Sequence, residues 1–148
     1  MIKPKECVAF ICVQNAGRSQ MAAAFAKRKV NEKGLPIGIV SGGTDPADSV
    51  HEAVVEAMDE IGYDISGNKP RKVKPEELEA CNYVITMGCS ATGVCPATWE
   101  GTDREWDLDD PADSGLKKVR RIRNEIEKQV NSLLDGIMDK YPKNKKNS

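Results

Sequence analysis

Five residues separate Cys12 from Arg18 in the segment Cys12-Val-Gln-Asn-Ala-Gly-Arg18-Ser19. A thiolate is a strong nucleophile, and a guanidinium is a planar fork that matches two oxygens of a tetrahedral anion. An apolar run, residues 7–13, precedes the segment, and a stretch of strong helix formers follows it. The backbone N–H groups between them can therefore curl around an anion at the positive end of a helix dipole. We predict that Cys12 is the nucleophile of an anion-binding loop.

The other loop residues have supporting roles in this interpretation. Gly17 lowers the steric cost of the curl, Asn15 holds its shape, and Ser19 donates a hydrogen bond to the Cys12 sulfur. The positive field favours the thiolate form of the cysteine. The competing interpretation is that Cys12 is a small buried hydrophobic residue, but its position between a strand and a helix favours catalysis. The predicted anion-binding residues are Val13, Gln14, Asn15, Ala16, Gly17, Arg18 and Ser19.

A candidate acid lies far downstream, in the segment Trp106-Asp-Leu-Asp-Asp-Pro-Ala112. A thiolate that attacks a tetrahedral oxyanion needs a proton donor for the oxygen that leaves. The carboxyl group of Asp110, on a loop stiffened by Pro111, is suited to that role. Aspartates in such a segment are also common turn and capping residues, so the assignment depends on its context.

Strands and helices alternate along the chain, which predicts an α/β fold. We expect a three-layer sandwich in which helices flank a four-stranded parallel sheet. Loops 12–19, 41–48, 88–101 and 109–114 each follow a strand and should meet at one edge. We expect Ser49-Val-His-Glu52 to be a capping box and Ser114 to cap the last helix. The predicted strands are 7–13, 37–41, 82–87 and 104–108, and the predicted helices are 19–30, 49–61, 75–79 and 116–138.

Length and composition limit the class of protein. The 148 residues fit a single domain, which we place at 1–140, followed by a polar tail at 141–148. The 22 basic and 23 acidic side chains nearly cancel, which argues against a nucleic-acid or membrane surface. The apolar run at 7–13 is too short to span a bilayer, and five cysteines do not suit a secreted disulfide framework. We therefore expect a cytoplasmic protein and a monomer.

No metal-binding role is expected for the remaining cysteines, and no catalytic role for the single histidine. Zinc sites favour cysteine pairs with two to four intervening residues, whereas seven separate Cys81 from Cys89 and five separate Cys89 from Cys95. We predict no metal site and no cofactor. Cys7 and Cys81 are expected to be structural, with Cys81 as a reserve resolving thiol. His51 is expected to be a surface or capping residue.

The chain order of these motifs resembles the low-molecular-weight protein tyrosine phosphatase fold, in which the cysteine loop is near the N-terminus and the Asp-Pro acid lies downstream. The resemblance covers residues 6–139. Within that superfamily the sequence is more similar to the thioredoxin-coupled arsenate reductases. Phosphatases of this fold carry aromatic residues that grip phosphotyrosine, whereas Ala112-Asp-Ser follows the proline here and residues 41–49 contain no aromatic residue. The segments that carry the closer resemblance are Cys12–Ala22, Ser41-Gly-Gly-Thr, Val84–Cys89, Cys95-Pro96 and Trp106–Ala112.

The resemblance implies a mechanism with three thiols. Cys12 attacks arsenate, Asp110 protonates the departing oxygen, and Cys89 then attacks the Cys12 sulfur and releases arsenite. Cys95 attacks Cys89 and frees Cys12, and thioredoxin reduces the resulting disulfide. Phosphate or sulfate would bind the same loop as substrate analogues.

Three alternatives remain open. Gly88 precedes Cys89, and relatives with this Met-Gly-Cys pattern can use a low-molecular-weight thiol as reductant. A phosphatase would need only Cys12, Arg18 and Asp110. A non-enzymatic oxyanion-binding module, as in phosphocarrier subunits with a similar loop, would need neither an acid nor a redox pair. The family's potassium-binding acidic residue is Ala23 here, so that site is not predicted.

Overall fold

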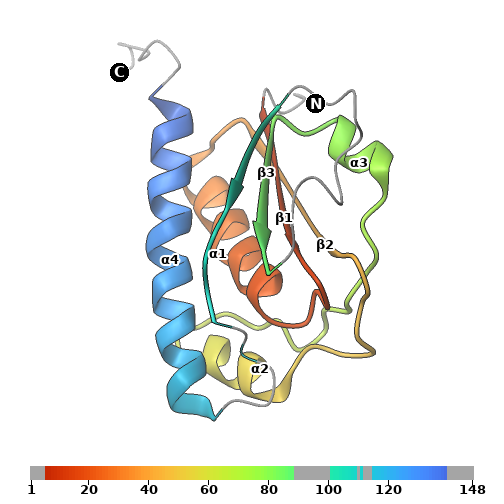
Figure 1. The fold of residues 1–148 in the computed structure, drawn as a ribbon. Helices are drawn as coiled ribbons and strands as arrows, with labels where there is room; N and C mark the ends of the chain where they lie inside the picture. The colour runs from red at the N-terminus through yellow and green to blue at the C-terminus, as the bar shows by residue number, and fades with distance from the viewer. Residues whose placement is uncertain (1–5, 89–100, 110, 112–114, 140–148) are drawn as a thin grey trace.

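The computed structural model describes residues 6–88, 101–109, 111 and 115–139. Within these ranges a single parallel sheet has the strand order β2-β1-β3-β4 (Figure 1). This agrees with the predicted four-stranded α/β sandwich. The strands are β1 (Glu6–Cys12), β2 (Ile37–Gly43), β3 (Tyr83–Met87) and β4 (Thr102–Glu105), and the helices are α1 (Arg18–Lys33), α2 (Glu52–Asp59), α3 (Pro75–Glu79) and α4 (Leu116–Met138).

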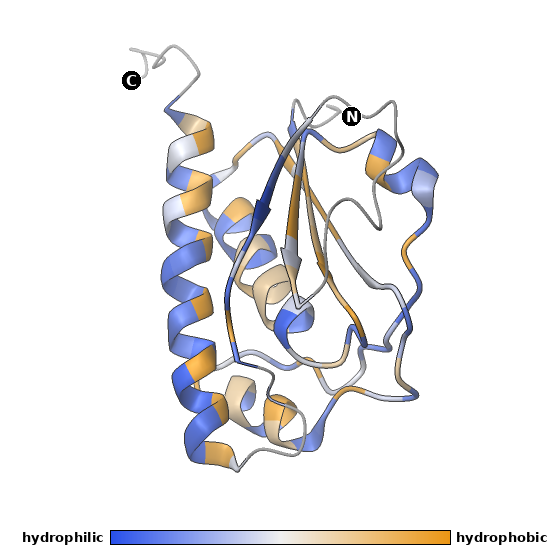
Figure 2. Ribbon diagram, in the orientation of Figure 1, coloured by the Kyte–Doolittle hydropathy of each residue, from blue (hydrophilic) through white to orange (hydrophobic). Residues whose placement is uncertain are grey.

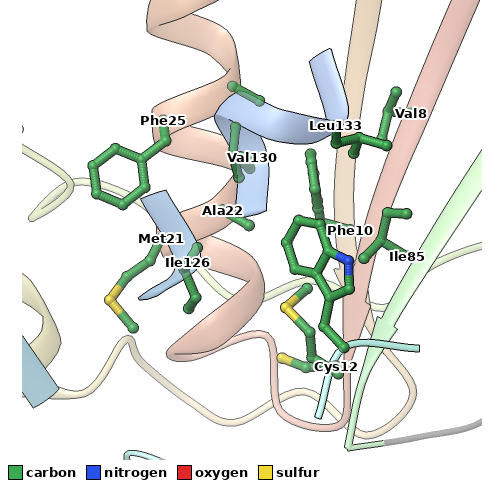
Figure 3. Close-up of a cluster of buried hydrophobic side chains, with 14 of the residues drawn as sticks. Val8, Phe10, Cys12, Met21, Ala22, Phe25, Ile85, Ile126, Val130 and Leu133 are labelled. Atoms are coloured by element: carbon green, nitrogen blue, oxygen red, sulfur yellow. The ribbon is translucent and has the colours of Figure 1, made fainter. Parts of the chain in front are cut away.

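The central strand β1 is buried on both faces, because its side chains alternate between two apolar clusters. Phe10 and Cys12 belong to the larger cluster, which α1, α2 and α4 complete. Ala9 and Ile11 belong to the smaller cluster, beside Leu78 of α3. Figure 3 shows the larger cluster, with Cys12 at one end of it. The nucleophile candidate is therefore rooted in the core, at the carboxyl end of β1.

Helix α4 covers the sheet with one long apolar stripe (Figure 2). Its apolar residues recur at the spacing of a helix face and are buried against α1 and α2. Burial of each such side chain contributes roughly 1.5–3 kcal/mol. Its buried residues are Val119, Ile122, Arg123, Ile126, Val130, Leu133, Leu134 and Ile137.

The structure corrects the limits of two strands. The prediction placed the fourth strand at 104–108 because Trp106 and Leu108 are apolar. The observed strand is Thr102–Glu105, and all four of its residues are exposed. Trp106 follows the strand, and its backbone N–H still donates to the Thr86 carbonyl at 2.9 Å. The second strand extends to Gly43, two residues beyond the prediction, because pairing with β1 continues as far as Cys12.

Both predicted helix caps are wrong. Helix α2 begins at Glu52 with His51 as its N-cap, and no side chain caps it. The His51 N–H instead donates to the Ala16 carbonyl, so the loop at 12–19 fixes where this helix starts. Helix α4 has Gly115 as its N-cap, also without a side-chain cap, so the prediction for Ser114 fails.

Among the described residues, no helix has both the length and the apolar character needed to cross a membrane.

Candidate active site

The Cys12 thiol is buried at the carboxyl end of β1, where only 3% of the residue is exposed. Its sulfur lies 2.9 Å from the Ser19 hydroxyl oxygen, and either group can be the donor. The backbone N–H of Asn15 also donates to the sulfur, at 3.2 Å. Two polar groups of the loop are thus held within hydrogen-bonding distance of the predicted nucleophile.

The peptide groups of the loop are turned in one direction. Four of its carbonyl oxygens accept hydrogen bonds from N–H groups of the segment after β2, at 2.8–3.2 Å. In a trans peptide the N–H points away from the adjacent carbonyl oxygen, so the loop N–H groups face the opposite side. The pairs, donor first, are Thr44 to Cys12, Asp45 to Val13, Ala47 to Gln14 and His51 to Ala16.

Asn15 holds the turn of the loop. Its φ of 51° is in the left-handed region, which asparagine tolerates better than most residues. Its side chain is buried and donates to the Ser19 hydroxyl at 2.7 Å. The carbonyl oxygen of that side chain accepts from the Gln20 amide at 3.1 Å and from the Arg71 backbone N–H at 3.0 Å. The predicted role of Asn15 in loop shape thus has a physical basis in three hydrogen bonds.

Arg18 lines the same pocket as Cys12, and the chain that follows β4 orients its guanidinium. One Nη donates to the Leu108 carbonyl at 3.1 Å, and only 8% of the residue is exposed. Gly88, just after β3, packs against the other side of this group. A Cβ at residue 88 would lie 2.8 Å from both terminal nitrogens, and its φ of +79° also favours glycine.

A pocket of about 190 Å³ opens above the loop, and its lining includes Arg18, His51 and Gly88. That volume exceeds the roughly 30 Å³ of one water molecule and can hold a tetrahedral oxyanion. The remaining lining residues are Cys12, Val13 and Gln14. His51 was not predicted to line this pocket, because its position depends on the long-range hydrogen bond from its backbone N–H to the loop.

Two glycines allow the chain to approach the loop closely. A Cβ at Gly17 would lie 2.7 Å from the Pro111 ring, so this glycine makes room for the segment that carries the predicted acid. A Cβ at Gly43 would lie 2.5 Å from the Val13 carbonyl oxygen, which explains a glycine at the end of β2. Both are packing requirements that the sequence alone could not reveal.

A partly exposed ion pair lies next to the hydrogen bonds of Asn15. Arg71, whose N–H binds Asn15, forms an ion pair with Glu77. Partial burial raises the pKa of Glu77, but the Lys74 backbone N–H and the Arg71 guanidinium outweigh it, so the pKa is lowered overall. Glu77 is therefore held as a carboxylate beside Arg71.

Three predicted catalytic residues, Asp110, Cys89 and Cys95, lie outside the described residues. Their covalent neighbours are described, since Gly88 lines the pocket and Pro111 lies against Gly17.

Cys81, the proposed reserve thiol, lies at the other edge of the sheet. It precedes β3, and its side chain forms a hydrogen bond with Cys7 at the start of β1. Cys7 and Cys12 are five residues apart on that strand, which corresponds to about 17 Å. Cys81 is therefore unable to reach Cys12 in this fold.

Comparisons with known proteins agree with this geometry. The family model for low molecular weight phosphotyrosine protein phosphatase matches residues 7–145. A putative arsenate reductase from Halobacterium salinarum is 49% identical over 128 residues, covering 85% of this chain and 89% of its own.

Two solved structures are also similar. The Corynebacterium glutamicum thioredoxin-dependent arsenate reductase is 33% identical, with a TM-score of 0.77 over 95% of this chain and 66% of its own. An arsenate reductase in its phosphate-binding state is 29% identical, with a TM-score of 0.76 over 89% of this chain and 98% of its own. The chain therefore belongs to the low-molecular-weight phosphotyrosine protein phosphatase family, in which it groups with the arsenate reductases.

Proposed function

We propose that this protein reduces arsenate to arsenite with Cys12 as the nucleophile. The observation that carries the proposal is the preorganised loop, in which Ser19 and the Asn15 N–H contact the Cys12 sulfur and Arg18 lines the same pocket. Arsenate is a tetrahedral oxyanion, and a ring of N–H groups with one guanidinium is complementary to its shape and charge. The relatives named as arsenate reductases support the choice of arsenate over other oxyanions.

In the first step the Cys12 thiolate attacks arsenic, and one oxygen leaves as water. Asp110 supplies a proton to that oxygen, and Arg18 with the loop N–H groups holds the other oxygens. The contact of Pro111 with Gly17 supports Asp110 as the acid, because Pro111 is the residue that follows it in the chain. The product is a covalent thiol–arsenic(V) adduct on Cys12.

In the second step Cys89 attacks the Cys12 sulfur. The sulfur–arsenic bond breaks, its electron pair stays on arsenic, and arsenite is released with a Cys12–Cys89 disulfide left behind. The position of Gly88 in the pocket wall supports Cys89 for this step, because Gly88 is the residue that precedes it in the chain. Cys95 then attacks Cys89, frees Cys12 as a thiolate and forms the Cys89–Cys95 disulfide.

Thioredoxin is the proposed reductant of that disulfide, since a similar solved structure is a thioredoxin-dependent enzyme. A reducing compartment such as the cytoplasm fits a cycle that begins from free thiols. We propose that the protein acts as a monomer.

Single-turnover assays test the relay. With stoichiometric arsenate and no reductant, the wild-type chain is expected to release one equivalent of arsenite and to contain a Cys89–Cys95 disulfide by peptide mapping. Cys95→Ser should release arsenite but stop at the Cys12–Cys89 disulfide. Cys89→Ser should hold the arsenic adduct on Cys12, so full arsenite release by this variant would overturn the relay.

The alternative functions and reductants predict different assay results. Fast hydrolysis of an aryl phosphate that survives the loss of both Cys89 and Cys95 would favour a phosphatase. Turnover with a small thiol and none with thioredoxin would change only the reductant. Asp110→Asn is expected to slow formation of the adduct by about 100-fold, and an unchanged rate would remove Asp110 from the mechanism.

A further inference from the structure

A second pair of thiols lies away from the active site. Cys7 is the second residue of β1 and Cys81 precedes β3, so both are on the amino side of the sheet. Both contact the smaller apolar cluster, which lies on the opposite face of β1 from Cys12. Their side chains are hydrogen-bonded to each other. The two thiols are thus hydrogen-bonded neighbours, while Cys12 is in a separate environment.

The backbone around the pair is fixed in a way that suits a cross-link. The Asn82 N–H donates to the Cys7 carbonyl at 2.9 Å, and the Cys7 N–H donates to the Asn82 side-chain oxygen at 2.9 Å. These bonds tie Cys7 to the residue next to Cys81. Disulfides require closely spaced backbones, and these two bonds hold the backbone of Cys7 beside the segment that carries Cys81.

The two thiols differ in accessibility and in chemistry. Cys7 is partly exposed, whereas Cys81 is 3% exposed. The hydrogen bond from Cys81 lowers the pKa of Cys7, against the opposing effects of burial and of the Glu77 carboxylate. A partly exposed thiol of lowered pKa with a buried thiol at its side is the arrangement of an attacking and a resolving cysteine.

We propose that Cys7 and Cys81 form a second redox-active dithiol, which a small hydroperoxide closes to a disulfide independently of the active-site loop. Cys7 loses its proton and its sulfur attacks a peroxide oxygen, so that the O–O bond breaks and Cys7 becomes a sulfenic acid; the hydroxide that leaves takes up the proton lost by Cys7 and forms water. Cys81 then attacks the Cys7 sulfur, hydroxide leaves and takes the Cys81 proton, and a second water forms. Two thiols and one hydrogen peroxide thus give one disulfide and two waters.

The experiment uses the full chain with Cys12, Cys89 and Cys95 replaced by serine, which leaves only Cys7 and Cys81. After treatment with one equivalent of hydrogen peroxide, we expect an intact-mass loss of about 2 Da and a peptide that links residues 7 and 81. Mass gain by oxygen with both thiols still separate, or a cross-link between chains, would overturn the proposal.

The wild-type chain provides a second measurement if that variant folds poorly. Inorganic phosphate, added to occupy the active-site loop, should leave the rate of formation of the 7–81 peptide unchanged. A rate that falls as phosphate slows alkylation of Cys12 would show that oxidation begins at Cys12 and would overturn independence.

A matched pair of variants tests the hydrogen bond. Cys81→Ser keeps a donor beside Cys7, whereas Cys81→Ala removes it. Alkylation of Cys7 by iodoacetamide at neutral pH is expected to be about fivefold slower in the alanine variant than in the serine variant. Equal rates would show that Cys81 does not activate Cys7.

Discussion

The two ends of β1 carry cysteines in different surroundings. At the carboxyl end, Cys12 receives hydrogen bonds from within its own loop and lies in a pocket with Arg18. At the amino end, Cys7 has a second thiol as its hydrogen-bond partner and the carboxylate of Glu77 nearby. One sulfur lies among donors and a cation that suit an anionic substrate, and the other lies beside a group that suits disulfide formation.

The difference follows from the polarity of a parallel sheet. The carboxyl ends of its strands lead into loops and helix N-termini, whose N–H groups attract anions. The amino ends have no such donors, so a cysteine there depends on neighbouring side chains. The same residue type on the same strand therefore acquires different chemistry according to its end.

The largest difference between the two ends of β1 is expected in the rate of arsenite formation. Cys12→Ser should lower the initial rate of arsenite formation by about 10⁴-fold or more, because no other group can form the adduct. Cys7→Ser should retain the rate within about twofold, since Cys7 is remote from the pocket. Comparable losses in both variants, measured with thioredoxin in excess, would erase the distinction.

Gly88→Ala is expected to damage only the anion-binding end. The new methyl group would meet the Arg18 guanidinium and weaken a charged hydrogen-bond donor, so phosphate should bind about tenfold more weakly by calorimetry. Gly34→Ala is the control, because φ there is +62° and the space is open. Both should lose about 1 kcal/mol of unfolding free energy from backbone strain. Weaker phosphate binding in the Gly34 variant would contradict this explanation.

Substitutions at Asn15 separate backbone from side chain. Asn15→Ala removes three hydrogen bonds and leaves a strained φ, so we expect a loss of about 3 kcal/mol in the free energy of unfolding. Asn15→Gly removes the same bonds but accepts the φ, and its loss should be about 1 kcal/mol smaller. Chemical denaturation measures both. Equal losses would show that the left-handed φ at residue 15 does not destabilise the alanine variant.

The smallest expected effect concerns Glu77, which affects both ends through Arg71 and Cys7. Its lowered pKa means that its stabilising contribution is present above the unfolded value near 4.3 and is lost as pH falls through the folded value. Glu77→Gln should therefore be less stable than wild type by about 0.5 kcal/mol at pH 7, and the gap should close below pH 4. Alkylation of Cys7 should rise slightly, because a repelling charge is gone.

Sequence patterns were sufficient for the sheet and for the loop that ends β1. The apolar run at 7–13 and the glycine after α1 are local signals, and the structure has a strand and a helix end there. The helix caps failed because Ser49 matched a local pattern, whereas α2 starts where His51 binds the Ala16 carbonyl. Long-range contacts of this kind leave no periodic signal in the chain.

The same reasoning explains which parts of the site went unseen. Cys12, Arg18 and Ser19 are close in sequence, so their spacing was informative. Arg71 binds Asn15 across 56 residues, and Cys7 meets Cys81 across 74. Nothing in the sequence marked those pairs, because each depends on how strands far apart in the chain come together.

The outward-turned carbonyl groups of the loop have a consequence for selectivity. Their partners lie in the protein itself, so the loop is already shaped before any ligand arrives. Such a loop selects for shape and charge, in which arsenate and phosphate are nearly alike. In the proposed relay, competition between them is decided after binding, because arsenic accepts an electron pair from the broken sulfur bond far more readily than phosphorus. Discrimination becomes a property of the electron flow, and abundant phosphate would act as a reversible occupant that delays turnover.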